Sequence, residues 1–175
     1  EEELESEINT TNTYTNVLPS LTVQYNATKD LILRAAATTA LARPNYYALA
    51  PYVNNVASDM EITAGNPDLD ATYSYNYDFM AENYFKSVGV ISGGVFYKKL
   101  HDFIYNYSDS NYTTAKFAAD FPIQDNPIPV GENWTFVQPK NGDTVDVYGF
   151  EVAFQRQLDF FESKFLKGFG IYLNY

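Results

Sequence analysis

The segment Tyr73–Ile104, with the sequence YSYNYDFMAENYFKSVGVISGGVFYKKLHDFI, decides the fold because it predicts one long β-hairpin. In its first arm the odd-numbered positions from Tyr73 to Ala81 are aromatic or apolar, and the even-numbered positions from Ser74 to Glu82 are mostly polar. A period of two residues is typical of a strand whose two faces meet different surroundings. The turn is expected at Lys86-Ser87. Both arms exceed the roughly 5–6 residues of an ordinary strand and reach the roughly 9–11 with which a tilted strand crosses a bilayer.

Further strands are predicted on both sides of this hairpin. The same alternation covers 20–26, 31–41, 148–157 and 169–175. Together with the two hairpin arms, these segments predict about six antiparallel strands.

The connections between these strands alternate between short turns and long excursions. The two long excursions, from Arg43 to about Asp70 and from about Ser108 to Asp143, contain several prolines that interrupt regular structure. We expect both to be irregular surface loops, which is where binding residues are often found. In outer-membrane barrels the short turns face the periplasm and the long loops face outside.

Composition excludes several classes of protein. The 175 residues have a formal charge of -11 and contain no cysteine. Nucleic-acid binding needs clustered Lys and Arg, so we expect no nucleic-acid partner. Without cysteine there is no disulfide scaffold, thiolate metal site or cysteine nucleophile. The start Glu1–Glu5 is unlike a signal peptide, and no apolar run approaches the roughly 18 residues of a transmembrane helix. If this chain enters a membrane, it must therefore do so as part of a β-barrel.

Five blocks of sequence, in order, carry a resemblance to a known family. They are LRAA at 33–36 with LARPNY at 41–46, GNPDL at 65–69, NYD at 76–78, GVFYKK at 94–99 with DFI at 102–104, and VYGFE at 147–151. These blocks resemble the successive barrel signatures of TonB-dependent outer-membrane receptors, particularly those of the Bacteroidetes type. The resemblance covers roughly Leu18 to Tyr175. There are two departures from the family pattern: Asp70-Ala71 replaces a frequent Lys-Pro, and Ala37 stands at an often aromatic site.

The resemblance implies an all-β fold, namely an antiparallel transmembrane β-barrel segment with long extracellular loops. It would supply about six strands of a roughly 22-stranded barrel, and six strands cannot close alone because the smallest single-chain barrels use about eight. Residues 1–17 would be an acidic or polar loop or tail, and residues 18–175 a partial barrel. Since the family's plug domain has no counterpart in this sequence, the resemblance implies a fragment from the C-terminal half of the barrel.

The resemblance also implies a function. The parent receptor would sit in the outer membrane of a Gram-negative bacterium and import a scarce, bulky nutrient: a ferric siderophore, haem, cobalamin or a glycan. Its partners would be outer-membrane lipid, the nutrient ligand, and the TonB complex, which acts through the missing plug. No cofactor, resident metal or catalytic residue is implied.

Loop aromatics are the candidate ligand contacts, because flat amphipathic rings bind such nutrients well. They are Tyr46, Tyr47, Tyr52, Tyr112 and Trp134. Packing within the loops is the alternative role for all five. On the polar parity of the strands, Arg34 is expected to form an ion pair inside the barrel with Glu82 or Glu151.

Two other classes of protein remain open at this point. A soluble β-sandwich binding module, such as a carbohydrate-binding or adhesin domain, would bury the aromatic faces in a core. A β-rich hydrolase would use paired carboxylates such as Asp78 and Glu82, which share a strand face. The single histidine, His101, lacks the partners of a metal site or a catalytic triad. An acidic group from Asp59 to Asp70 could hold calcium, with solvated loop charge as the alternative.

Overall fold

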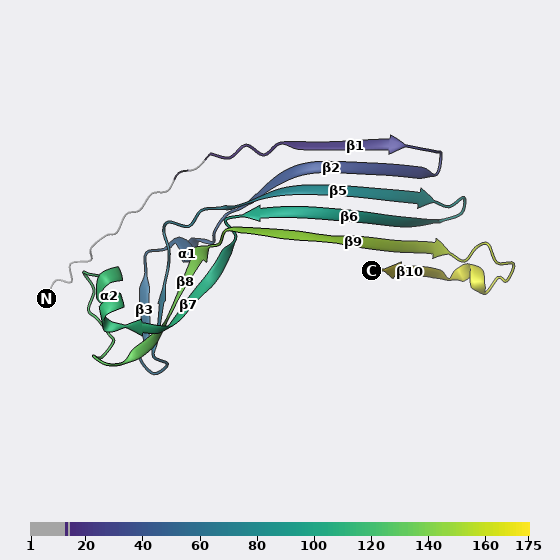
Figure 1. Cartoon of the computed structure of the whole chain (residues 1–175). Helices are drawn as coiled ribbons and strands as arrows, with labels where there is room; N and C mark the ends of the chain where they lie inside the picture. Colours follow the sequence, from purple (N-terminus) through teal and green to yellow (C-terminus); the bar gives the residue numbers. More distant parts are fainter. Residues whose placement is uncertain (1–12, 14) are drawn as a thin grey trace. The chain divides into compact units, whose positions relative to one another are not determined.

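A computed structural model describes residue 13 and residues 15–175. Most of the predicted polar segment 1–17 therefore lies outside the described residues. The described chain forms two compact units (Figure 1). One contains a six-stranded sheet, and the other, which we call the loop unit, comprises residues 42–72 and 102–143.

The six-stranded sheet contains the strands that alternation predicted. They are β1 (Ser20–Asn26), β2 (Leu31–Ala42), β5 (Thr72–Tyr84), β6 (Gly89–His101), β9 (Thr144–Gln157) and β10 (Gly170–Asn174). They lie side by side in the order β1-β2-β5-β6-β9-β10 (Figure 1). The pairs β1–β2, β5–β6, β6–β9 and β9–β10 are antiparallel. The prediction of six antiparallel strands is thus confirmed for this sheet.

The strand register places the aromatic and aliphatic residues of these strands on one face of the sheet. Phe79 of β5 pairs with Val95 of β6, and Val95 pairs with Phe150 of β9. The exposed fractions of these side chains are 49%, 56% and 59%. Within this unit, none of the described residues forms a second layer over these side chains, whereas a soluble β-sandwich requires one.

The second arm of the central hairpin ends earlier than predicted. The two arms of the hairpin end at Thr72 and His101, and Ile104 belongs instead to the next strand, β7 (Ile104–Thr113). Between them Asp102 has φ 56°, in the left-handed region that breaks a ladder. Alternation across residues 101–104 continues through this break, so the pattern alone could not locate it.

The prediction that both excursions are irregular loops is wrong. Together they form a second sheet of β3 (Val53–Val56), β4 (Glu61–Ala64), β7 and β8 (Asn133–Asn141), in the order β3-β4-β8-β7. β4 pairs in parallel with β8, although about 70 residues separate them. β3 and β4 have only four residues each, too few for a periodic signal. Pro139 lies inside β8 but beyond the residues of β8 that pair with β4, so its missing N–H breaks no bond of that ladder.

The loop unit has a hydrophobic core of its own. The buried residues that contact one another there are Ile62, Ala64, Tyr112, Phe117, Ile128, Trp134 and Phe136. Two short helices, α1 (Tyr46–Leu49) and α2 (Thr114–Asp120), complete this unit. A 3-10 helix, Leu166–Gly168, precedes β10 in the other unit. None of the helices among the described residues has the length and apolar character needed to span a membrane.

Candidate functional site

The candidate site lies in the loop unit, on the surface formed by β7, β8 and the segment around α2. Its foundation is aromatic: the rings of Tyr112 and Phe136 stack with their centroids 4.5 Å apart. Tyr112 pairs with Trp134 across the β7–β8 ladder, and both side chains are almost fully buried. Phe117 is the buried residue of α2 and fixes that helix on the core.

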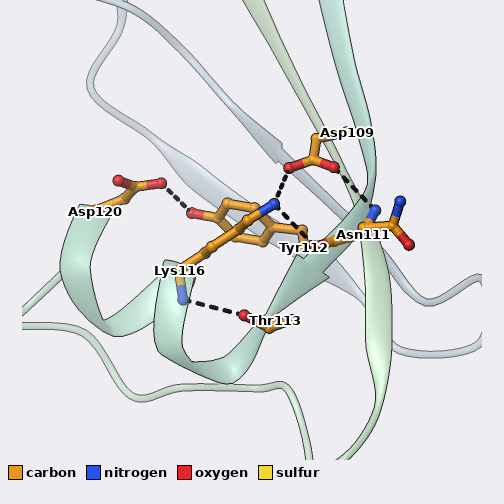
Figure 2. Close-up of polar contacts among 6 residues, drawn as sticks. All are labelled: Asp109, Asn111, Tyr112, Thr113, Lys116 and Asp120. Atoms are coloured by element: carbon orange, nitrogen blue, oxygen red, sulfur yellow. Dashed lines mark hydrogen bonds and ion pairs between the residues drawn. The ribbon is translucent and has the colours of Figure 1, made fainter.

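Helix α2 begins where a side chain can satisfy its first free N–H groups. The Oγ1 of Thr113 accepts a hydrogen bond from the backbone N–H of Lys116 at 3.4 Å, as an N-cap residue does. This start directs the Lys116 ammonium back along β7, where it donates to Asp109 at 2.6 Å and to the backbone carbonyl of Asn111 at 3.0 Å (Figure 2). At the other end of the helix, the Tyr112 hydroxyl donates to Asp120 at 2.6 Å.

These contacts shift the pKa values of two groups. The hydrogen bond from Lys116 is the main reason why the pKa of Asp109 lies below its usual range. Burial, followed by the bond to Asp120, raises the pKa of Tyr112 far above its usual value. Asp109 therefore remains ionised at neutral pH and Tyr112 remains a neutral donor.

A hollow of about 490 Å³ opens over this network. Besides the network, Tyr107, Gln138 and Lys140 line it. The Lys140 ammonium lies 4.0 Å from the centroid of the Tyr107 ring, in the position of a cation–π contact. The hollow thus offers ammonium, phenol, carboxylate and amide groups over an aromatic floor.

A second hollow of about 470 Å³ shares Asp120, Phe121 and Gln138 with the first. Tyr52 and the Gly65–Asp68 segment line its other side. Burial and a hydrogen bond with Tyr47 raise the pKa of Tyr52 to about 12, so this phenol also stays neutral.

The five predicted ligand aromatics do not form one cluster. Tyr46 and Tyr47 belong to α1, whose start is capped by the Asn45 side chain, and they are 93% and 68% exposed. Tyr52 stacks near Tyr47, with centroids 4.5 Å apart, and lines the second hollow. Tyr112 and Trp134 are 2% and 4% exposed and pack in the core. Their packing is established, whereas ligand contact by any of the five stays a prediction.

Sequence reasoning missed the polar residues that organise this unit. Asn141 accepts a hydrogen bond from the backbone N–H of Asp70 at 2.9 Å and donates to the carbonyls of Asp70 at 3.1 Å and Asp102 at 2.7 Å. It therefore ties the first excursion to the second. Lys116, Lys140 and Gln138 were missed as well. No spacing in the sequence signals contacts between residues about 70 positions apart.

The alternative chemistries find little support. Glu82 makes an ion pair with Arg34, at 3.4 Å between Oε1 and Nε, as one of the two sequence predictions proposed. Asp78 lies four residues away along β5, which places the two Cα atoms about 13 Å apart. Among residues 13 and 15–175 no three His, Asp or Glu side chains form a metal-binding group. His101 contacts Thr144 at 3.3 Å.

Comparison with known proteins places these observations in context. The family model described as TonB dependent receptor-like, beta-barrel matches residues 4–175. A variant of the ferric enterobactin receptor PfeA from Pseudomonas aeruginosa, in complex with enterobactin, aligns with a TM-score of 0.60 at 21% identity over 82% of this chain and 20% of that chain. The siderophore receptor PirA from Pseudomonas aeruginosa aligns with a TM-score of 0.60 at 19% identity over 80% and 25%.

A third solved structure is the hemophore receptor HasR from Serratia marcescens, in complex with its hemophore and heme, with a TM-score of 0.59 at 15% identity over 79% of this chain and 20% of that chain. At these identities the likeness shows the fold alone. The chain spans about a fifth to a quarter of the length of these structures. The comparison with curated proteins gives no match.

Proposed function

This chain belongs to the TonB-dependent receptor β-barrel family, and from that premise we propose that it forms part of the barrel of an outer-membrane receptor that imports a scarce, bulky nutrient. Residues 18–175 would supply barrel strands and the loop unit, and residues 1–17 a polar loop or tail. The complete receptor would sit in the outer membrane of a Gram-negative bacterium. The TonB complex would energise transport by pulling on a plug domain inside the barrel.

The observation that carries this proposal is the uncovered apolar face of the six-stranded sheet. Strands β2, β5, β6 and β9 are 12 to 14 residues long, enough to cross a bilayer at a tilt. The residues on one face of these strands, which would face outward, are aromatic and aliphatic. The opposite face, which would face inward, carries the Arg34–Glu82 ion pair. Apolar outside and polar inside is the alternation of a transmembrane barrel.

We propose that the loop unit takes part in nutrient capture. Its hollows combine aromatic rings with hydrogen-bonding groups, which suits a ligand such as a siderophore, haem, cobalamin or a glycan. The loop unit, residues 42–72 and 102–143, contains ten Asp and Glu against three Lys and Arg. This balance favours a neutral or cationic nutrient over a multiply anionic one, because like charges repel an approaching ligand.

Uptake measurements test the proposal. Cells that lack the receptor gene should lose uptake of one radiolabelled nutrient from a panel of ferric siderophores, haem, cobalamin and oligosaccharides, and the plasmid-borne gene should restore it. Removal of TonB should abolish the restored uptake. Recovery of the receptor in a detergent-free soluble fraction, or uptake that persists without TonB, would contradict the proposal.

Tyr46 and Tyr47 allow the loop contribution to be tested separately. Their rings are exposed, so Tyr46→Ala and Tyr47→Ala leave the core intact. We expect them to weaken nutrient binding several-fold without lowering receptor abundance. Val130→Ala, at an equally exposed position of the same unit, is the control and should leave binding unchanged.

A further inference from the structure

The connection between β9 and β10, residues 158–169, is rich in exposed phenylalanine. Four side chains there are between 42% and 73% exposed: Phe160, Phe161, Phe165 and Phe169. We call this connection the Phe-rich turn. A turn that faced only water would expose fewer rings, because large exposed apolar patches mark contact surfaces.

Arg156 ends the apolar row of β9 beside this turn. It shares the parity of Phe150 and Phe154, so it lies on the apolar face of the sheet. Its guanidinium carbon lies 4.6 Å from the centroid of the Phe85 ring and 4.2 Å from that of Phe160. Two rings therefore hold the guanidinium in one orientation.

The charge of this guanidinium has no counterion among the described residues. The two ion pairs found there are Arg34–Glu82 and Lys116–Asp109, and the Nε of Arg156 is buried without a hydrogen-bond partner. A guanidinium donates several parallel N–H bonds, a geometry that matches phosphate oxygens. The guanidinium can therefore bind an oxyanion that the described residues do not provide.

The charged residues around Arg156 are of both signs, with an excess of cations. The turns 27–30 and 85–88, together with residues 156–169, contain five Lys and Arg against three Asp and Glu. Backbone hydrogen bonds join the three regions, from Tyr84 to Asp30 and from Gln157 to Val88. This end of the sheet is therefore basic within a chain whose net charge is -11.

We propose that Phe85, Arg156 and the Phe-rich turn bind the phosphate group of an anionic phospholipid. Aromatic rings concentrate at the level of lipid headgroups, and basic side chains there gain about 1 kcal/mol each from anionic lipid. Arg156 supplies the donors for the phosphate, while the exposed phenylalanines lie against the acyl chains and glycerol. The inference rests on the proposed placement of the sheet in the outer membrane.

Native mass spectrometry of the full-length receptor in detergent tests this site. Phosphatidylglycerol and phosphatidylcholine with identical acyl chains are added in equal amounts, and the bound lipids are counted. We expect the receptor to retain phosphatidylglycerol in preference to phosphatidylcholine. Arg156→Gln should lower phosphatidylglycerol retention about fivefold, the value of one basic residue near anionic lipid, and leave phosphatidylcholine retention unchanged.

Matched variants and competitors make the outcome decisive. Lys98→Gln removes a cation from the opposite face of the same sheet and should change nothing. If Arg156→Gln does not fold, Phe160→Leu, which removes one ring and keeps the charge, should still lower retention. Equal retention of the two lipids, or unchanged retention in the variants, overturns the proposal. Displacement by millimolar inorganic phosphate identifies a free-phosphate site instead, and capture of a periplasmic protein without lipid preference identifies a protein interface.

The same cells separate this inference from the proposed function. TonB-dependent uptake together with no lipid preference overturns the lipid site alone. Absence of the receptor from the outer membrane overturns both.

Discussion

The six-stranded sheet and the loop unit place their hydrophobic residues in opposite ways. All nine apolar residues that are buried among the described positions belong to the loop unit. In the sheet, Phe79, Val95 and Phe150 lie in register across three strands and are about half exposed. Both regions are rich in aromatic residues, so composition does not cause the difference.

Under the proposed function the two regions meet different solvents, lipid for the sheet and water for the loop unit. The loop unit removes its apolar side chains from water by packing them against one another, as soluble domains do. In the sheet, hydrogen bonds between strands pair the backbone N–H and C=O groups, and the apolar side chains on one face would contact lipid. A substitution should therefore have an effect that depends on the region more than on the residue type.

Phe117→Ala should have the largest effect. The side chain is 1% exposed and joins α2 to the core of the loop unit. Its loss should destabilise that unit by about 3–5 kcal/mol, the usual cost of removing a buried Phe. Amide hydrogen exchange over residues 104–141 is the measurement. Phe150→Ala changes the six-stranded sheet and should leave amide exchange over residues 104–141 unchanged. Equally faster exchange over these residues in both variants would contradict the independence of the two units.

Phe150→Arg tests the medium around the sheet. In a water-exposed position this substitution would be nearly neutral, whereas a lipid-facing Arg near the bilayer midplane costs about 2–4 kcal/mol. We expect a reduced folding yield in phospholipid vesicles, measured by the heat-modifiable mobility of the folded barrel. Gln155→Arg, on the opposite face of the same strand, is the control and should fold as the wild type does. Equal folding yields from the two variants would contradict the lipid-facing position of Phe150.

The fold of the sheet could be predicted from sequence because its signal is local. Alternation in segments such as 73–81 identifies a strand and its faces without knowledge of its neighbours. The same reasoning predicted the Arg34–Glu82 ion pair as one of two alternatives. Its two residues lie on the polar face of the sheet, on neighbouring strands. This reasoning did not locate the break at Asp102, because a single left-handed residue leaves the alternation on either side intact.

The loop unit could not be predicted because its strands pair with partners that lie far away in the sequence. β4 has four residues, and its parallel partner β8 begins about 70 positions later. Prolines in both excursions indicated irregular structure, and the aromatic residues gave no means to separate exposed Tyr46 from buried Trp134. Tertiary contacts determined that difference. Asn141 shows the same limit, since an ordinary polar residue became the link between two excursions.

Asn141→Ala should weaken the link within the loop unit. The side chain makes three hydrogen bonds to backbone groups of Asp70 and Asp102. These backbone groups belong to exposed residues, so the loss should cost about 0.5–1.5 kcal/mol, the net contribution of ordinary hydrogen bonds. We expect faster amide exchange at residues 66–72 and unchanged exchange in β5 and β6. Asn133→Ala, at the other end of β8, is the control. Unaltered exchange at 66–72 would mean that water replaces the lost bonds.

The smallest expected effect is a pH dependence confined to the loop unit. Because the hydrogen bond from Lys116 lowers the pKa of Asp109 in the folded protein, the ionised carboxylate favours the folded state. That contribution is fully present above the unfolded carboxyl pKa of about 3.9 and is lost as the pH falls through the lower folded value. We therefore expect amide protection around β7 and α2 to decrease in acid more steeply in the wild type than in Asp109→Asn. Asp125→Asn removes an exposed carboxylate that makes no ion pair among the described residues, and should retain the wild-type slope. The slope should be modest, since exposed ion pairs contribute little. Identical slopes in the wild type and in Asp109→Asn would show that Lys116 positions the helix without stabilising it electrostatically.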